Sequence, residues 1–595
     1  MMSPLELNNL IEQLCAAELL AQARPMPTTV LNEPWAAGLA AAIEGVARVD
    51  DRELRLRVGF TLGFPSQLPR IYVLDTDLPR RVPHVGQHGW VCFQEPEGLL
   101  LDRHRPVDVA REAVARAIDT LRRGLSGDNH ADFIEELALH WPGAPEGFVF
   151  FNAGDETQDV FRVLLPATLA FGFVRNRDQA LAQARPPGLA GPMLAGVVDT
   201  LITTSWLRGL YIPLSNVPRP IDPFPVGPWT PTQVARFVRE NLSDVESQRL
   251  DHRIRGMKKP TTFVIVRVPR PRGGDHLVGV EYTNIRGAHP LARNPGLADL
   301  RQFQVLRQDP GYLVPRGGGA EALQGKRVLL IGCGAIGGHL ALELVRCGVG
   351  HMTLVDPDVL RPENQHRHVL GAPPLGVRPS KSVLLATEIH QRYPGVHATG
   401  LCAAIGDALA CGAVKPAEYD LILSATGEHN VERALHEHLS RTAGRPSMLF
   451  TWLEPLGIGG HAFAQPATRA PARPRGCFEC LFTPHRADST PALANRAAFA
   501  APGQVFTREL AGCGNAFTPY SSLDALRTAG VAARLAIDVM LGHVDAALLR
   551  SWKGTAEAFN AAGLRTSPRY DLAADVLERG LHDIAVPGCP VCGAA

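Results

Sequence analysis

A glycine-rich turn between two apolar strands is the feature that most constrains the fold of this chain. Residues 328–331 form a short apolar run of the kind that makes a buried parallel strand. Three glycines in the spacing G-x-G-x-x-G follow this run: Gly332, Gly334 and Gly337. A helical pattern covers 339–347, and a second strand is expected at 351–355, ending on Asp356. This βαβ pattern lets a phosphate approach the backbone at a helix N-terminus.

The glycine motif alone does not separate NAD from ATP, because Asp356 could bond a ribose hydroxyl of either nucleotide. The residues that follow are more selective. Asn364, Arg367 and Lys381 place an amide and two cations just beyond the end of the second strand. NAD chemistry has no use for such a cluster, whereas a triphosphate that is cut between its α and β phosphates does. We therefore expect an ATP-type site, with a glycine-rich packing turn as the alternative.

This region resembles the ThiF/MoeB/ubiquitin-activating enzyme family, which has the same glycine loop, strand-end Asp, Asn-x-x-Arg and later Lys. The resemblance covers roughly residues 320–595 and implies a Rossmann-like adenylation domain. It further implies that Asp356 holds the ribose and that three side chains surround the phosphates of ATP: Asn364, Arg367 and Lys381.

The magnesium ligand of that family is altered here. The run that begins at Asp420 predicts a third strand of the same sheet. In the family the corresponding strand ends in Thr-Asp, and that Asp helps to bind Mg²⁺. Here Thr426 is followed by Gly427 and then Glu428, so the usual carboxylate is missing. Glu428 and Asp358 are candidate substitutes, and the sequence does not choose between them.

Composition sets the remaining bounds. A chain of 595 residues is too long for one core, and about three or four domains are expected. The net charge of +1 gives no reason to expect nucleic acid or a membrane as partner. The N-terminus carries Glu6 and no basic region, so no signal peptide is expected. The eleven cysteines then indicate reduced thiols, metal ligands or nucleophiles in a cytoplasmic protein.

Residues 1–145 are expected to form a smaller α+β domain. Its irregular loop at 82–93 ends in a cysteine, Cys92. Periodicity predicts four elements around this loop: a helix at 4–23, strands at 54–58 and 71–74, and a helix at 107–121.

Taken alone, a cysteine beside a Gly-Trp turn is more often a small buried residue than a nucleophile. The order of elements, however, resembles a ubiquitin-conjugating enzyme core, in which Gly89 and Cys92 match the family's Gly-x-x-Cys. The resemblance implies that Cys92 is the conjugating nucleophile. Val82-Pro83-His84 replaces the family's His-Pro-Asn. His84 therefore occupies the position of the Asn, and its imidazole could donate a hydrogen bond to the oxyanion in place of the amide.

Residues 146–320 carry no metal spacing, nucleophile or phosphate loop. The apolar runs at 261–269 and 276–284 predict a strand pair, and residues 232–242 predict a helix. The expectation is a mixed α/β linker domain that joins two active modules.

Two C-x-x-C pairs lie about 110 residues apart: Cys477 with Cys480, and Cys589 with Cys592. Tetrahedral Zn²⁺ needs four ligands, and each C-x-x-C turn presents two thiolates from one tight loop. A structural zinc site is therefore expected, as ThiF-like enzymes carry one, with a redox dithiol as the alternative.

Between these pairs, Cys513 lies between glycines ahead of a helical pattern at 523–540. A thiol near a helix N-terminus has its thiolate favoured by the helix dipole. An ordinary buried cysteine is the alternative. The resemblance to activating enzymes implies instead that Cys513 is the acceptor thiol.

Together these expectations describe an α/β multidomain enzyme with a conjugating-like domain (1–145), a linker (146–320) and an adenylation domain (321–595). ATP activates a protein C-terminus, Cys513 takes it as a thioester, Cys92 receives it, and a lysine amine accepts it. This order of modules is similar to the fused enzymes of bacterial anti-phage CBASS operons. The resemblance implies that the activated partner is the C-terminus of a cGAS/DncV-like nucleotidyltransferase, and that the enzyme is a homodimer.

Three alternatives stay open at this point. A sulfur-carrier-protein adenylyltransferase would share the adenylation core and zinc but leave Cys92 without a role. An NAD-dependent oxidoreductase would leave Arg367, Lys381 and the zinc pairs without one. A non-catalytic scaffold would explain the missing Thr-Asp carboxylate and the altered His-Pro-Asn.

Overall fold

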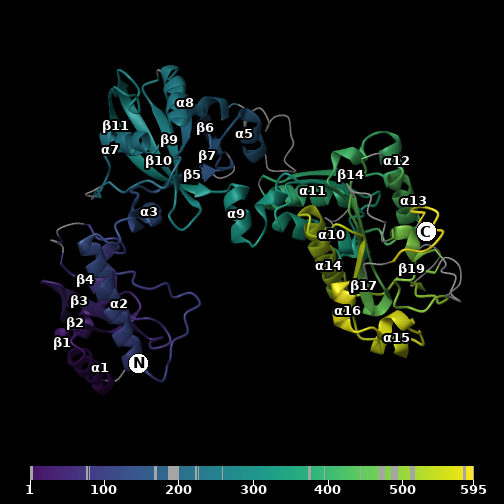
Figure 1. The fold of residues 1–595 in the computed structure, drawn as a ribbon, viewed down its shortest axis with the longest axis horizontal. Helices are drawn as coiled ribbons and strands as arrows, with labels where there is room; N and C mark the ends of the chain where they lie inside the picture. Colours follow the sequence, from purple (N-terminus) through teal and green to yellow (C-terminus); the bar gives the residue numbers. More distant parts are fainter. Residues whose placement is uncertain are drawn as a thin grey trace.

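The computed structural model shows the chain as three lobes that follow one another along the sequence (Figure 1). It describes residues 4–75, 78, 81–165, 170–184, 200, 202–221, 224–225, 227–257, 259–372, 377–393, 395–442, 444–467, 476–483, 494–509, 516–580 and 584–593. Among these residues, no helix has both the length and the apolar character needed to cross a membrane.

The N-terminal lobe is a four-stranded antiparallel sheet with strands in chain order. Its elements are α1 (Pro4–Ala16), β1 (Ala21–Pro25), β2 (Leu39–Val49), β3 (Arg52–Thr61), β4 (Arg70–Val73) and α2 (Pro106–Ser126). The helices cover one face, where Leu14 and Leu121 are fully buried in a cluster with Leu56 and Val58 of β3. The helix predicted over 4–23 was too long: it ends at Ala16 because the residues from 21 onward pair with β2 as an edge strand.

The middle lobe is a closed seven-stranded barrel in the order β10-β11-β5-β7-β6-β8-β9. Its strands are β5 (Pro145–Val149), β6 (Gln158–Leu165), β7 (Ala170–Val174), β8 (Leu207–Pro213), β9 (Thr262–Pro269), β10 (Asp275–Arg286) and β11 (Leu297–Arg307). The predicted strand pair is confirmed as β9 and β10, which are antiparallel. Sequence patterning missed the closure, which depends on parallel pairs between distant segments, such as β11 with β5.

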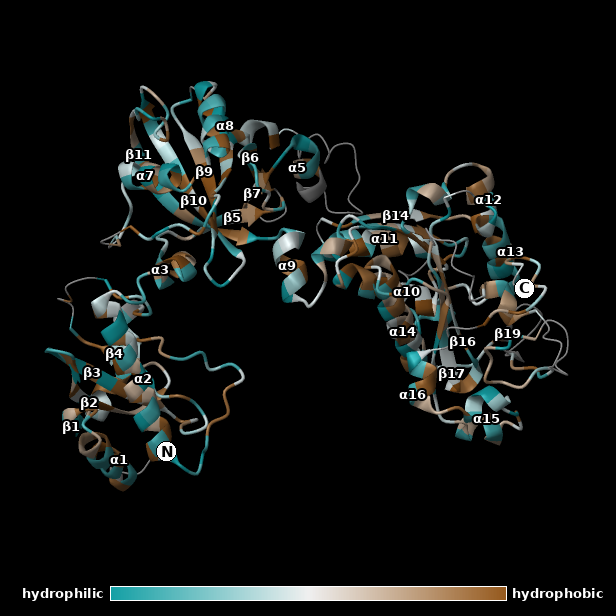
Figure 2. Ribbon diagram, in the orientation of Figure 1, coloured by the Kyte–Doolittle hydropathy of each residue, from teal (hydrophilic) through white to brown (hydrophobic). Residues whose placement is uncertain are grey.

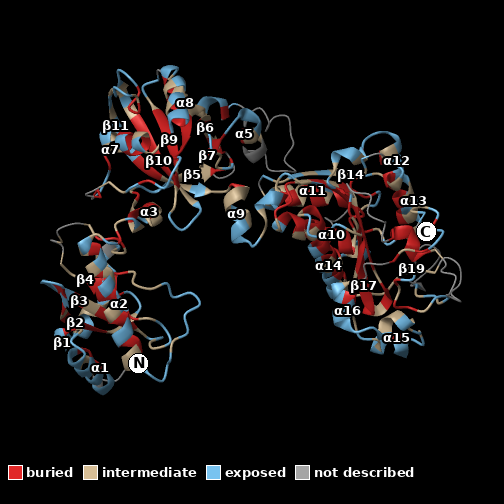
Figure 3. Cartoon of the chain, in the orientation of Figure 1, coloured by how far each residue is buried: buried red, intermediate tan, exposed pale blue. Residues whose placement is uncertain are grey.

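Helices pack outside the barrel: α5 (Arg177–Ala184), α7 (Pro231–Glu240) and α8 (Asp244–Arg255). Two short helices precede it, α3 (Asp132–Glu135) and α4 (Leu137–His140). Their apolar side chains join the buried cluster of the barrel, where Phe133 stacks on Phe224 with centroids 4.2 Å apart. Figure 3 shows α3 between the N-terminal lobe and the barrel. By packing, this segment goes with the barrel, and the boundaries at 145 and 320 stay predictions.

The C-terminal lobe is a seven-stranded sheet in the order β14-β13-β12-β15-β16-β17-β20. Its first five strands are parallel, and the sixth strand is antiparallel to both of its neighbours. The strands are β12 (Arg327–Ile331), β13 (His351–Val355), β14 (His397–Leu401), β15 (Leu421–Ser424), β16 (Ser447–Leu453), β17 (Gly459–Gln465) and β20 (Leu548–Lys553). The predicted βαβ unit and the third strand are thereby confirmed.

Helices cover both faces of this sheet. The helices of this lobe are α9 (Pro310–Arg316), α10 (Ala335–Arg346), α11 (Lys381–Arg392), α12 (Ile405–Ala410), α13 (His429–Ser440), α14 (Ser522–Met540), α15 (Glu557–Ala561) and α16 (Ala574–Arg579); a small ribbon pairs β18 (Arg508–Glu509) with β19 (Ala516–Phe517). Leu330 and Leu423 face the cluster with α10 and α14, whereas Leu329 and Ile422 face the opposite cluster. Burial on both faces explains why these strands read as continuous apolar runs, visible in Figure 2.

Two glycines of the G-x-G-x-x-G turn have different roles in this fold. A β-carbon added to Gly337 would lie 1.9 Å from the carbonyl oxygen of Gly332, whereas one added to Gly334 meets nothing within 4 Å. Gly337 is therefore required for close packing of α10 against the end of β12.

We predict that Gly337→Ala destabilises α10 by about 1–3 kcal/mol, because the backbone must move to admit the methyl group. Gly334→Ala replaces the N-cap residue but meets no neighbour, so it should change the same quantity by less than about 1 kcal/mol. Hydrogen–deuterium exchange of the α10 amides measures the local opening free energy in both variants. Equal protection in the two variants would contradict the assigned packing role.

Candidate functional site

The carboxylate of Asp356 connects the ends of the first two strands. It accepts hydrogen bonds from the backbone N–H groups of Cys333 and Asp358, each at 2.7 Å. Asp356 is only 6% exposed, so these bonds compensate for its lost hydration. The glycine turn is also fixed from the other side, because His368 Nε2 lies 2.6 Å from the carbonyl oxygen of Cys333. His368 Nδ1 accepts the N–H of Leu370, which leaves the proton on Nε2 as donor.

Lys381 occupies the first position of α11, where it is 8% exposed. Its ammonium donates to Asp358 Oδ2 at 2.9 Å, and its backbone N–H donates to the carbonyl oxygen of Asp358 at 3.0 Å. Ser380 caps the helix by accepting the N–H of Val383. The ammonium is therefore held close to the strand-end carboxylates, at the expected edge of the sheet.

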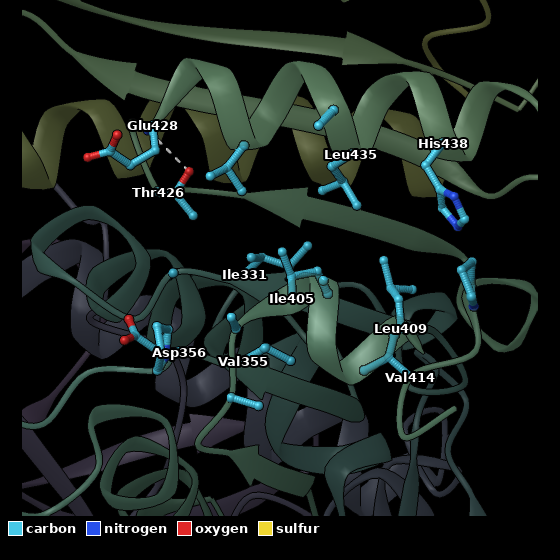
Figure 4. A pocket seen from close by; sticks show the side chains of 18 of the residues that line it. Ile331, Val355, Asp356, Ile405, Leu409, Val414, Thr426, Glu428, Leu435 and His438 are labelled. Atoms are coloured by element: carbon cyan, nitrogen blue, oxygen red, sulfur yellow. Dashed lines mark hydrogen bonds between the residues drawn. The ribbon is translucent and has the colours of Figure 1, made fainter. Parts of the chain in front are cut away.

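These residues line a cavity of about 1090 Å³ at the carboxyl ends of the parallel strands. Its polar end is lined by Gly332, Gly334, Asp356, Asp358, Lys381, Thr426 and Glu428. Its apolar part lies between α12 and α13, with Ile405 and Leu409 facing Leu435 across the gap (Figure 4). An apolar slot that continues into a polar end is what a nucleotide base and its phosphates require. Sequence reasoning did not find the slot, because its walls lie on two helices far from the glycine motif.

Not every predicted nucleotide residue lines this cavity. Gly332, Gly334, Asp356 and Lys381 do, whereas three others are absent from the lining: Gly337, Asn364 and Arg367. Asn364 Oδ1 accepts the N–H of Arg361 at 3.1 Å. The Arg367 guanidinium lies over the ring of Tyr520, 5.4 Å from its centroid.

A buried carboxylate supports the loop where the family's magnesium ligand is missing. Glu432 is fully buried and accepts hydrogen bonds from Ser424 Oγ at 3.0 Å and Thr426 Oγ1 at 3.1 Å. His429 Nδ1 lies 3.1 Å from the same carboxylate. Thr426 in turn accepts the N–H of Glu428. The sequence signal for this group is the polar Ser-x-Thr at a strand end, followed by an acid in the first turn of α13.

The two C-x-x-C pairs come together as one cluster of four sulfur atoms, all within 4.8 Å of one another. Sγ distances are 3.8 Å for Cys477 to Cys480, 3.7 Å for Cys477 to Cys589 and 3.6 Å for Cys480 to Cys592. A tetrahedron with Zn–S bonds of about 2.3 Å has edges of about 3.8 Å. A disulfide needs about 2.05 Å. The convergence of all four sulfur atoms at this spacing fits Zn²⁺, whereas a redox dithiol, the alternative, needs only one C-x-x-C pair.

Cys92 ends a tightly bonded loop. Its N–H donates to the carbonyl oxygen of His84 at 2.8 Å, and the Gly86 N–H donates to that of Trp90 at 2.8 Å. Gly89 has φ +78°, and a β-carbon there would lie 2.0 Å from the carbonyl oxygen of Val73, so only glycine fits. Cys92 itself is partly exposed. Burial raises the pKa of its thiol, and the charges of Glu136 and Glu95 add to this effect.

His84 lies between two carboxylates. Its Nδ1 is 2.6 Å from Glu136 Oε1 and its Nε2 is 2.9 Å from Asp132 Oδ2. The bond to Glu136 is the largest cause that raises the pKa of His84, and the bond to Asp132 adds to it against the effect of burial. Burial acts to raise the pKa of the Glu136 carboxyl, but hydrogen bonds from His140 and His84 lower that pKa to about 2. Donation from His84 to an oxyanion would therefore require one of these contacts to be exchanged.

Cys513 lies outside the described residues. The helix expected after it is confirmed as α14, which starts at Ser522. Ser521 caps this helix by accepting the N–H of Asp524, whose carboxylate accepts the N–H of Ser521 in return.

Comparison with known families agrees with both predicted modules. Residues 312–562 match the ThiF family, and residues 41–150 match prokaryotic E2 family B. The chain therefore joins a ThiF-type domain to an E2-like domain, as predicted. The predicted enzyme class, a ubiquitin transferase-like enzyme, and the multidomain α/β fold are confirmed at this level.

Individual proteins are similar to this chain over most of its length. An ATP-dependent ubiquitin transferase-like protein Cap2 from Pseudomonas aeruginosa is 26% identical over 501 residues, covering 81% of this chain and 84% of that protein. A Cap2 protein from Escherichia coli is 23% identical, covering 70% and 74%. These similarities confirm the predicted resemblance to fused activating and conjugating enzymes. Among solved structures, E. coli MccB with ATP matches 46% of this chain and 68% of its own, at 16% identity and a TM-score of 0.31.

We predict that Lys381→Ala weakens ATP binding roughly 10- to 100-fold, the effect of losing one charge-assisted contact to phosphate. Lys326→Ala is the matched control, since Lys326 pairs with Asp420 and is not among the residues that line the cavity. Isothermal titration of each variant with ATP and Mg²⁺ measures the effect. Equal loss in both variants would argue against this cavity as the nucleotide site.

A second prediction concerns the sulfur cluster. The purified chain should contain one zinc ion, and Cys480→Ser should lose it and lower the unfolding temperature of the C-terminal lobe by at least about 5 °C. Cys15→Ser, which changes an exposed thiol on α1, should retain the zinc. Elemental analysis and thermal unfolding measure both quantities. Full zinc content in the Cys480 variant would contradict the assignment.

Proposed function

We propose that this enzyme uses ATP to activate the C-terminal carboxylate of a protein and then conjugates that protein to lysine amines. The observation that carries the proposal is the coexistence of two sites in one chain. The cavity around Asp356 and Lys381 has the polar and apolar parts that a nucleotide needs, and Cys92 ends the active-site-like loop of an E2-like domain. The name of the Cap2 relatives, ATP-dependent ubiquitin transferase-like protein, supports ATP as the nucleotide.

In the first step, a carboxylate oxygen of the bound protein attacks the α-phosphorus of ATP. The bond to the β-phosphate breaks, and pyrophosphate leaves. Asp356 holds the ribose: each of its oxygens accepts one backbone N–H and retains a lone pair for a hydroxyl. Lys381 neutralises phosphate charge beside the backbone of the glycine turn. Asn364 and Arg367 lie outside the cavity lining, and to act on the phosphates they would have to turn toward the cavity from the segment after β13. Mg²⁺, which balances triphosphate charge when bound, would be held by Asp358 or Glu428, the acidic side chains at the polar end.

Two thiols then carry the acyl group. The sulfur of Cys513 attacks the acyl-adenylate, the bond to phosphate breaks, and AMP leaves. The Cys92 thiol loses its proton as its sulfur attacks the carbonyl carbon of that thioester. The C–S bond to Cys513 breaks, and Cys513 leaves as a thiolate that takes up a proton. Finally, a lysine amine attacks the Cys92 thioester, the C–S bond breaks, and the amine loses a proton as the amide forms.

For the activated protein we propose a cGAS/DncV-like nucleotidyltransferase, in a cytoplasmic anti-phage defence system, with the enzyme acting as a homodimer. Two observations support this proposal. The chain is similar to Cap2 proteins over most of its length, and its order of modules is that expected of the fused enzymes of such operons. A net charge of +1 gives no independent attraction for nucleic acid or membranes.

The rival activities use less of the molecule. A sulfur-carrier-protein adenylyltransferase would employ the cavity but not the E2-like domain with Cys92. A scaffold would employ neither, and would leave the buried Lys381 and Asp356 at the cavity without a role. The proposal accounts for both modules.

The test is a non-reducing gel of the enzyme with ATP, Mg²⁺ and a cGAS/DncV-like nucleotidyltransferase. We expect reducible adducts in wild type. Cys513→Ala should abolish them, because no acyl group leaves the adenylate. Cys92→Ala should retain an adduct on the remaining thiol and should block transfer to lysine.

The controls separate the alternatives. ATP consumption without an adduct in wild type would support sulfur-carrier activation. Neither ATP use nor adduct, with several such nucleotidyltransferases, would support the scaffold. Adducts that survive Cys513→Ala would contradict the order of the relay.

A further inference from the structure

The segment from Asp132 to Trp141 has two faces that contact different lobes. Its apolar side chains Phe133, Ile134 and Leu137 are buried in the cluster that covers the barrel. Trp141 is 3% exposed, and its indole N–H donates to the carbonyl oxygen of Gly279 in β10 at 3.1 Å. The segment is therefore anchored to the barrel rather than to the N-terminal sheet.

Its polar face contacts the loop of Cys92. Glu136 Oε1 lies 2.6 Å from His84 Nδ1, and Glu136 Oε2 accepts the backbone N–H of His84 at 3.1 Å. Asp132 contacts the other ring nitrogen of His84. The carbonyl oxygen of His84 accepts the N–H of Cys92. One carboxylate on a barrel-anchored segment is thus two hydrogen-bonded steps from the nucleophile.

The contacts continue beyond Glu136 into the barrel lobe. His140 Nε2 lies 3.3 Å from Glu136 Oε2, and its Nδ1 lies 3.1 Å from the Arg81 guanidinium. Arg81 also donates to the carbonyl oxygen of Pro225 at 2.7 Å. This chain of polar contacts begins at the loop of Cys92 and ends on the barrel lobe, whose sequence carries no metal spacing, nucleophile or phosphate loop.

We infer that Glu136 is a positioning residue for acyl transfer at Cys92, acting through His84, and that the barrel lobe is thereby part of the conjugating site. The inference rests on the proposed function for the transfer itself. The middle lobe is then more than a spacer. It fixes the Glu136 carboxylate, and this carboxylate holds the Cys92 loop.

The physical reason lies in the backbone of His84. Its φ of +65° is unfavourable for a residue with a β-carbon, so contacts must hold it. Glu136 bonds both its ring and its N–H, which orients the carbonyl oxygen that receives the Cys92 N–H. The departure from the family's Asn is then no loss of function: the ring takes part in holding the loop.

Charge adds a dependence on pH. The charged groups that face His84 are Asp132 and Glu136, with Arg272, 3.9 Å from Asp132, and His140 and Arg81 behind Glu136. As the pH rises through the raised pKa of His84, its ring keeps only one N–H, and one carboxylate contact is lost. The loop is therefore held most firmly on the acidic side of that pKa.

The first experiment measures the reactivity of Cys92 in the full chain and needs no partner. Iodoacetamide alkylation of the Cys92 peptide is followed by mass spectrometry from pH 6 to pH 10. Glu136→Gln should raise the rate at pH 8 roughly three- to tenfold, because it removes a negative charge that disfavours the thiolate. It should also shift, to lower pH, the part of the rate–pH profile that reflects the titration of His84.

The matched control is Glu135→Gln. Glu135 lies on the same helical turn and bonds the Arg272 N–H at 3.1 Å and Arg270 at 3.5 Å. It therefore shares the packing but not the contact with His84. We expect it to leave both the alkylation rate and its pH profile unchanged, and Glu136→Asp to restore part of the wild-type profile.

The second experiment uses the Cys92 thioester formed with ATP and the nucleotidyltransferase, discharged with hydroxylamine. Glu136→Gln should slow discharge at least tenfold, and Glu135→Gln should not. Identical alkylation profiles for the two variants, or identical discharge rates, would overturn the inference. If wild type forms no thioester, the proposed function fails, whereas the alkylation profiles still decide whether Glu136 controls the Cys92 loop.

Discussion

The nucleotide site depends on the bonds that the Asp356 carboxylate makes to two backbone N–H groups. A carboxylate that is 6% exposed is stable as an anion only if such donors replace water. By accepting from Cys333 and Asp358, it fixes the glycine turn after β12 and the turn after β13 at the same time. The turn after β13 also supplies Asp358, whose carboxylate accepts a hydrogen bond from the Lys381 ammonium. One anion thus organises the polar end of the cavity before any ligand arrives.

The sequence predicted those features of the fold and the site that a local pattern of residues determines. Strands buried on both faces read as apolar runs, so β12, β13 and β15 were found, and paired cysteines at fixed spacing located the sulfur cluster. What it missed depends on distant segments. The apolar slot needs α12 and α13 to converge, and the barrel closes through parallel pairs with no local signal. The contact of Glu136 with His84 joins residues 52 positions apart.

The middle lobe has defined polar contacts at both ends. Toward the N-terminal lobe, Arg81 donates to Pro225 and Glu136 bonds His84. Toward the C-terminal lobe, the Asn152 side chain donates to Gln324 and accepts the N–H of Gly311. Both sets consist of directional hydrogen bonds. In the proposed relay an acyl group passes between thiols on separate lobes, and directional contacts define how neighbouring lobes are oriented better than a flexible linker would.

The two kinds of cysteine in this chain are controlled in opposite ways. The clustered thiols lie at the sulfur spacing of a zinc tetrahedron, where Zn²⁺ would stabilise their thiolates. Cys92 instead has its pKa raised by burial and by the charges of Glu136 and Glu95, so it rests as a thiol. A protonated thiol is a poor nucleophile toward stray electrophiles. Of these two carboxylates, Glu136 also bonds the ring and the N–H of His84. In the proposed transfer, the residue that disfavours the Cys92 thiolate therefore also holds the Cys92 loop in place.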